Sequence, residues 1–173
     1  MKFLCAALSA GLLIAQPTTQ ESEMTIAAKA FIESLTPEQR QQAVFAPDSP
    51  ERTKWAFVPL DRKGVAWRDM NDAQKAAGVK LLKTALSDEG YKKVEDIRGL
   101  ESILRTLENG NLGRDTNRYW FVFFGSPSSK TPWVWRYEGH HLSLTFGSKE
   151  GEVVSSTPQF LGSNPAGSDP TRL

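Results

Sequence analysis

The sequence predicts an α+β fold in which N-terminal helices pack on a mainly antiparallel β-sheet. Three observations support it: apolar residues recur at helical spacing in the first half, aromatic and β-branched runs fill residues 118–146, and a short turn signal joins two of those runs. A length of 173 residues corresponds to one domain. We expect that domain over residues 21–155, after a signal peptide at 1–20 and before an irregular tail at 156–173.

The first residues have the order of a secretory signal peptide. Lys2 supplies a positive charge, Leu4–Ala15 is apolar or small throughout, and polar residues follow. This run is shorter than the roughly 20 residues that a transmembrane helix needs, and we expect no membrane span once it is removed. A secreted or periplasmic location follows. The alternative is a buried N-terminal helix.

Composition excludes several classes of protein. The 21 basic and 20 acidic residues nearly balance, which argues against a nucleic-acid partner because phosphate binding needs a concentrated cationic face. A charged fraction of 24% with 10% aromatic residues excludes wholesale disorder. The single cysteine, Cys5, excludes a disulfide scaffold and a cysteine-based zinc site, and it lies within the expected signal peptide.

Start signals define the helices of the first half. Thr36 and Gln39 form a capping box around Pro37, and Asn71 with Gln74 has the same spacing. Ser87 restarts a helix after a tight break, with acidic residues in its first turn. The helices expected are Met24–Leu35, Pro37–Phe45, Asn71–Leu86 and one from Ser87 to about Asn109.

Strand signals dominate the second half. Arg118–Phe124 is apolar on both faces, which is typical of a central strand. The other strands expected are Lys54–Val58, Trp133–Tyr137, His140–Phe146 and Glu152–Ser155.

Glu138 and Gly139 are the residues expected in the turn of a hairpin. Strand alternation then places two sets of side chains on opposite faces. The first set is apolar apart from one histidine: Trp133, Trp135, Tyr137, His140, Leu142 and Leu144. The second set is polar: Arg136, Glu138, His141, Ser143 and Thr145. The two adjacent histidines therefore point in opposite directions in a regular strand.

The polar face suggests a binding site for a small polar or anionic ligand, held by Arg136, His141 and Ser143. A guanidinium grips a carboxylate, phosphate or sulfate through two parallel hydrogen bonds. The alternative is a solvated sheet face. The aromatic stripe fills a core or, alternatively, stacks against sugars. A metal site on His140 and His141 requires a bulged strand, and the chain shows no matching acidic cluster.

Several segments together resemble the family called domain of unknown function 3500. They are RKGV at Arg62–Val65, LLKTALSDEGY at Leu81–Tyr91, FFGSP at Phe123–Pro127, the Trp133–Leu144 segment with its Trp-Arg and Gly-His-His, and the Thr157–Pro165 segment. The similarity spans about Ala27 to Pro165. Val134 and Phe146 depart from the glycine and the polar residue that the resemblance implies there.

The resemblance implies an exported protein whose full-length relatives are longer, with a second half carrying further histidine and aspartate. It implies that this chain is the N-terminal half of a longer family domain. A divalent metal would then need ligands outside this chain beside His140 or His141. Two functions stay open: an exported module that binds a small polar or anionic ligand, and a truncated member of a metal-assisted exported enzyme family.

Overall fold

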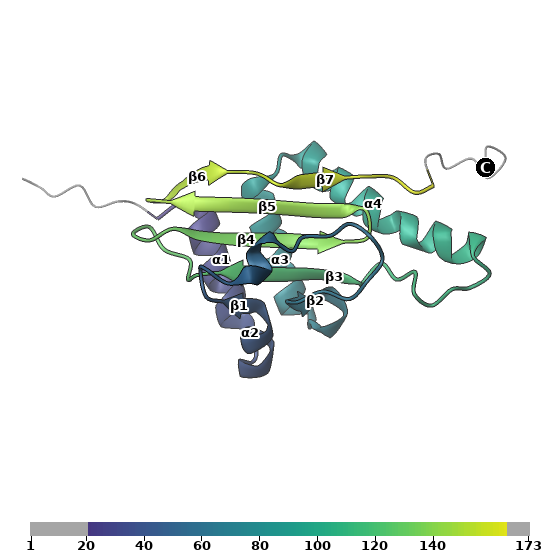
Figure 1. Ribbon diagram of the computed structural model, residues 1–173, viewed down its shortest axis with the longest axis horizontal. Coiled ribbons are helices and arrows are strands. Elements are labelled where there is room, and N and C mark those ends of the chain that lie inside the picture. The colour runs from purple at the N-terminus through teal and green to yellow at the C-terminus, as the bar shows by residue number, and fades with distance from the viewer. Residues whose placement is uncertain (1–20, 166–173) are drawn as a thin grey trace, which may run out of the picture.

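A computed structural model describes residues 21–165. The signal peptide expected at 1–20 and the last part of the expected tail lie outside the described residues. The predicted α+β class is confirmed, because four α-helices accompany a mixed, mostly antiparallel sheet (Figure 1). The helices are α1 Glu23–Ser34, α2 Pro37–Ala43, α3 Asp72–Ala85 and α4 Asp88–Leu107, with 3₁₀ turns η1 Pro50–Thr53 and η2 Trp67–Asp69.

Seven strands form one sheet in the order β1-β3-β4-β5-β6, with β2 added beside β3 and β7 beside β5. The strands are β1 Val44–Phe45, β2 Val65–Ala66, β3 Tyr119–Phe124, β4 Trp133–Gly139, β5 Leu142–Lys149, β6 Glu152–Ser155 and β7 Gln159–Leu161. Only the short β1 runs parallel to its neighbour, and the other pairs are antiparallel. All six residues of β3 are buried, as expected of a central strand.

The helix start signals are confirmed. Thr36 accepts a hydrogen bond from the backbone N–H of Gln39, whose side chain bonds back to the Thr36 N–H. Asn71 and Gln74 form the same reciprocal pair at the start of α3. Gln74 also donates to the carbonyl of Ser34, so this capping residue ties the start of α3 to the end of α1.

One face of the sheet packs on the helices and holds the main core. The Phe31 ring of α1 lies 4.7 Å from the Phe121 ring of β3, and Trp135 stacks on Phe146 at 4.9 Å. The aromatic stripe of the hairpin belongs to this core: Trp133, Trp135 and Tyr137 are buried with Leu142 and Leu144. Its predicted role as core is therefore confirmed.

The opposite face is covered by residues 46–64, drawn in dark blue in front of the sheet in Figure 1. The strand expected over Lys54–Val58 is wrong, because this segment contains no strand. Its backbone forms no strand ladder, but it bonds to side chains and, through the Phe57 carbonyl, to the N–H of His141 at 2.7 Å. The N–H of Ala56 donates to the Glu138 carboxylate at 3.1 Å, and Arg62 donates to the carbonyls of Ala56 and Val58.

Residues 156–173 are expected to be an irregular tail, but the described part of this segment contains a strand. Gln159–Leu161 forms β7, which pairs antiparallel with the first residues of β5. Between β6 and β7, the carbonyl of Pro158 accepts a hydrogen bond from the N–H of Thr145 at 3.2 Å. The chain thus runs along the outer edge of β5 in two stretches, β6 beside its last residues and β7 beside its first.

Candidate functional site

The turn of the β4–β5 hairpin lies two residues further along the chain than the sequence suggested. Gly139 pairs with Leu142, so His140 and His141 are the turn residues, and the expected turn at Glu138–Gly139 is wrong. The reason lies in β3. A Cβ atom at Gly139 would sit 2.2 Å from the Tyr119 ring, so this glycine serves close strand packing and not a turn. His141 adopts the left-handed φ of 57° that the turn requires.

The displaced turn preserves the two faces of the strands but not the placement of the histidines. Because side chains alternate with a period of two, a two-residue displacement leaves every strand residue on its predicted face. The expectation that His140 and His141 point to opposite faces is wrong. Their rings lie 4.2 Å apart between centroids, because the turn frees both residues from strand alternation.

His140 belongs to a chain of polar side chains that connects the hairpin turn to α4 and the segment after it. Its Nδ1 contacts a carboxylate oxygen of Glu101, and an Nη1 of Arg114 lies 3.4 Å from the same nitrogen. The Glu101 carboxylate can serve as the acceptor in this contact. Arg114 in turn forms an ion pair with Glu108 at 2.7 Å. These contacts fasten the hairpin turn to α4.

His141 lies among aromatic rings. Phe57 and Phe160 stack at 4.3 Å, and both rings lie edge-on to His141. Burial, with a further contribution from His140, lowers the pKa of the His141 imidazole from its ordinary value of 6.5. The two imidazoles do not gain a third ligand: within residues 21–165 no group of three or more histidine, cysteine or acidic side chains is arranged to hold a metal ion.

Arg136 lies under the covering segment and not at an open surface. Its side chain is 2% exposed and forms an ion pair with Glu138 at 3.0 Å. It donates to the carbonyls of Arg52 and Glu51 at 3.1 and 3.2 Å. Burial raises the pKa of the Glu138 carboxyl, while Arg136 and Arg62 oppose that rise. The guanidinium of Arg136 is thus occupied by protein groups.

The three residues expected to hold a ligand do not converge. Ser143 shares the face of Arg136 but is fully buried, and His141 lies at the turn beside Phe160. Arg136 instead anchors η1, through the two carbonyls that it binds.

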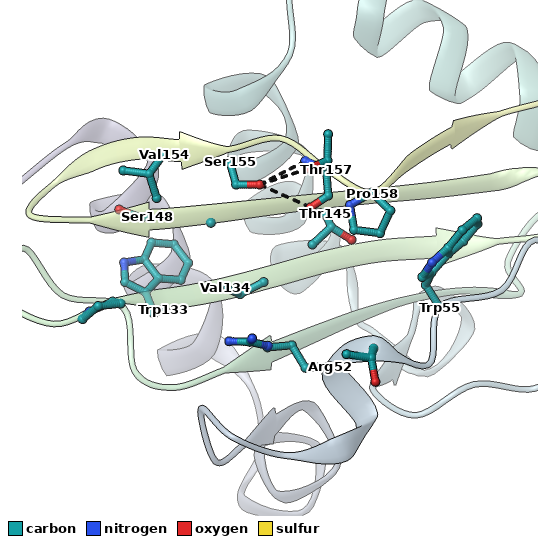
Figure 2. A pocket seen from close by; sticks show the side chains of 13 residues that line it. Arg52, Trp55, Trp133, Val134, Thr145, Ser148, Val154, Ser155, Thr157 and Pro158 are labelled. Carbon is teal, nitrogen blue, oxygen red and sulfur yellow. Dashed lines mark hydrogen bonds between the residues drawn. The ribbon is translucent and has the colours of Figure 1, made fainter.

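A groove opens on the same face of the hairpin, further from the turn (Figure 2). It has a volume of about 450 Å³, within the range of small-molecule sites. Its walls come from the covering segment, the β4–β5 hairpin, and the link between β6 and β7. The polar lining consists of Arg52, Thr53, Thr145, Ser148, Ser155 and Thr157, and the larger apolar lining includes Trp55, Val134, Val154 and Pro158.

Thr145 lines this groove and carries a buried, unpaired hydroxyl. It shares a sheet face with Arg136, its cross-strand partner, and lines the groove between Val134 and Pro158 (Figure 2). The residue is 6% exposed, and its Oγ1 has no hydrogen-bond partner among the described residues. A buried hydroxyl left without a partner costs about 1–3 kcal/mol.

Arg52 gives the groove a positive charge. Its side chain is exposed, and within residues 21–165 its guanidinium makes neither a hydrogen bond nor an ion pair. No acidic side chain lines the groove in the described part of the chain. Arg136, which the sequence predicted as a ligand contact, is buried and donates a hydrogen bond to the Arg52 carbonyl. It therefore fixes the backbone of Arg52, whose own side chain is exposed.

The sequence did not point to Arg52. No local motif marks it, because its position in the site depends on contacts between η1 and β4, which are far apart in the chain. Strand alternation predicts that Thr145 lies on the polar face of the hairpin, but no feature of the sequence marks it as part of a groove.

Among the described residues, no helix combines the length and apolar character of a membrane span. Comparison with curated proteins and with solved structures found no match. The sequence profile of one family, described as Protein of unknown function (DUF3500), matches residues 17–172. Nearly the whole chain is covered, and the chain therefore belongs to the DUF3500 family.

Proposed function

We propose that this chain is an exported binding protein that holds a small polar or anionic ligand in the groove on the polar face of the β4–β5 hairpin. The observation that carries the proposal is that two residues of the groove lining, Thr145 and Ser148, have buried hydroxyls without a partner among the described residues. Native proteins pair nearly all such groups, so an exception calls for a partner.

The charge of the groove selects the sign of the ligand. Arg52 is the charged side chain of its lining, and it has no competing carboxylate there. Arginine binds carboxylate, sulfate or phosphate groups through its planar fork. Arg136 acts as a positioning residue, because it holds the carbonyls of Glu51 and Arg52 at 3.2 and 3.1 Å.

The experiment uses sulfate and acetate as probes of the anion subsite. Thermal unfolding of the full chain is followed as either salt replaces sodium chloride at constant ionic strength. A ligand at ten times its dissociation constant stabilises the folded state by about 1.4 kcal/mol, so the midpoint should rise. The rise should vanish in Arg52→Ala and persist in Arg105→Ala, an exposed arginine on α4. An equal rise in all three proteins would refute the proposal.

A metal-assisted exported enzyme is the second candidate, and the 4.2 Å approach of the His140 and His141 rings favours it. The Glu101 carboxylate orients His140 through Nδ1, as outer-shell carboxylates orient ligating histidines. Metal analysis of protein purified without added metal separates the two candidates. Near-stoichiometric metal that is lost in His141→Asn supports the enzyme, and metal-free protein with intact anion binding supports the binding protein.

A further inference from the structure

We infer that the ligand of the groove is a sugar acid of the hexuronate class, whose carboxylate pairs with Arg52 and whose ring stacks on Trp55. This inference rests on the proposed function and adds the chemical class of the ligand. It is argued from the aromatic residue at one end of the groove, from the charge of the lining, and from its hydroxyl groups.

Trp55 lines the groove with its indole 36% exposed. Phe57, the aromatic ring beside it, is tilted by 39° with a centroid separation of 6.2 Å, so within residues 21–165 no ring stacks flat on the indole. Leaving part of so large an apolar side chain in water forgoes burial free energy. A ligand that covers the ring would recover it.

The backbone on both sides of Trp55 is fixed to the sheet. Before it, the carbonyl of Arg52 accepts a hydrogen bond from Arg136. After it, the N–H of Ala56 donates to Glu138 at 3.1 Å. Arg52 and Trp55 are therefore held three residues apart on an anchored segment, as a preformed site requires. Figure 2 shows both side chains at the wall of the groove opposite β5.

The surroundings of Trp55 decide what kind of group it stacks against. An exposed indole face attracts cations or the C–H faces of apolar and sugar rings. A cation is disfavoured here, because Arg52 carries the charge of the groove and no carboxylate lines it in the described chain. A sugar ring presents C–H groups on its face, which suit the indole of Trp55, and hydroxyls around its edge, which suit the serine and threonine side chains of the lining.

The hydroxyl groups of the lining suit the edge of such a ring. Thr145 and Ser148 have buried hydroxyls without a partner among the described residues. Ser155, at the opposite wall, bonds through its hydroxyl to Thr157 at 3.3 Å. Hydroxyls both donate and accept, so they match the alternating donors and acceptors of a polyol. A carboxylate on the ring completes the set by pairing with Arg52.

Titration calorimetry on the full chain tests the inference with matched probes. D-Glucuronate and D-galacturonate carry ring and carboxylate, D-glucose and D-galactose carry the ring alone, and acetate carries the carboxylate alone. We expect at least one uronate to bind about tenfold or more tightly than its neutral sugar and than acetate, a difference of about 1.4 kcal/mol.

Two variants locate the stacking contact. Trp55→Ala should lose the preference for the uronate over acetate while keeping the Arg52-dependent stabilisation by acetate. Phe57→Ala is the control, since Phe57 is 38% exposed on the same segment but does not line the groove. If acetate and sulfate bind through Arg52 and no uronate binds more tightly, the sugar inference is overturned and the binding proposal stands. If no probe acts through Arg52, both fail.

Discussion

The two faces of the sheet are built by different forces. On the helix face, aromatic rings of β3 and β4 pack against α1 and α3, and hydrophobic burial accounts for the contact. On the other face, residues 46–64 lie over the sheet and are held by a buried ion cluster of Arg62, Glu138 and Arg136. Burial alone can tolerate exchange of similar side chains, whereas directional bonds to backbone groups cannot. The candidate site lies on the second face.

The largest expected effect follows from removing the centre of the ion cluster. Arg136→Ala leaves Glu138 buried with a weaker partner and releases the carbonyls of Glu51 and Arg52. Breaking a buried pair costs about 3–5 kcal/mol, to be measured by urea unfolding, and anion binding should be lost with it. Arg136→Lys should fail to restore stability, because an ammonium lacks the planar fork.

A conservative exchange on the helix face is the matched control. Leu144→Met keeps the volume of a fully buried side chain, and such exchanges cost less than about 1.5 kcal/mol. If Arg136→Lys is as mild as Leu144→Met, the distinction between the two faces does not hold.

A smaller loss is expected where the two strands approach most closely. Gly139→Ala would place a Cβ 2.2–2.7 Å from three atoms of the Tyr119 ring. Overpacking of this kind costs about 1–3 kcal/mol. Gly99→Ala is the control of opposite sign: nothing lies within 4 Å of its Cβ position in α4, and alanine in a helix interior stabilises by about 0.5–1 kcal/mol. Equal effects at the two glycines would contradict the close packing that fixes the hairpin register.

The turn is where prediction from the sequence failed, and the cause is visible at this glycine. The capping boxes at Thr36 and Asn71 were predictable because they depend on residues three positions apart. The burial of β3 was predictable from its composition. The functions of Gly139 and Ala56 were not, since each depends on a contact with a distant residue, Tyr119 in one case and Glu138 in the other. The Glu138-Gly139 pair suggests a turn from the sequence, but the glycine is needed because the Tyr119 ring of β3 leaves no room for a Cβ there.

The same reasoning explains why the candidate site was predicted only in part. Alternation placed Arg136, Ser143 and Thr145 on one face from the sequence alone, and the structure agrees. Which of them reaches a ligand depends on the covering segment, which buries Ser143 and engages Arg136 but leaves Thr145 at the groove.

The pH dependence of stability should distinguish the turn from the rest of the sheet. The pKa of His141 is lowered in the folded protein, so the unfolded chain takes up a proton at a higher pH than the folded one. Its stabilising contribution is complete above pH 6.5, the ordinary value, and is lost as the pH falls through the lowered folded-state pKa. Besides burial, His140 and Arg114 lower the pKa of this imidazole, whereas Glu101 and a backbone hydrogen bond to Ser163 oppose that shift.

Urea unfolding between pH 7.5 and 5 measures this contribution as a difference between wild type and His141→Asn. Asparagine tolerates the left-handed backbone that the turn requires. The wild type should lose stability on acidification more steeply than the variant, because His140 and the other groups are common to both. Parallel pH profiles would show that His141 contributes nothing to this dependence.

The smallest change in stability is expected at Thr145, which lines the groove. Thr145→Val replaces an unpaired buried hydroxyl with a methyl group of similar shape, so the free energy of unfolding should change by less than about 1 kcal/mol or rise slightly. Ser143→Ala removes a hydroxyl that is likewise buried and unpaired on the same face, but outside the groove. Both variants should therefore fold normally, and only Thr145→Val should weaken uronate or acetate binding in calorimetry. If both weaken binding equally, or neither does, the unpaired hydroxyl of Thr145 is a packing imperfection of the covered face and not a contact kept for a ligand.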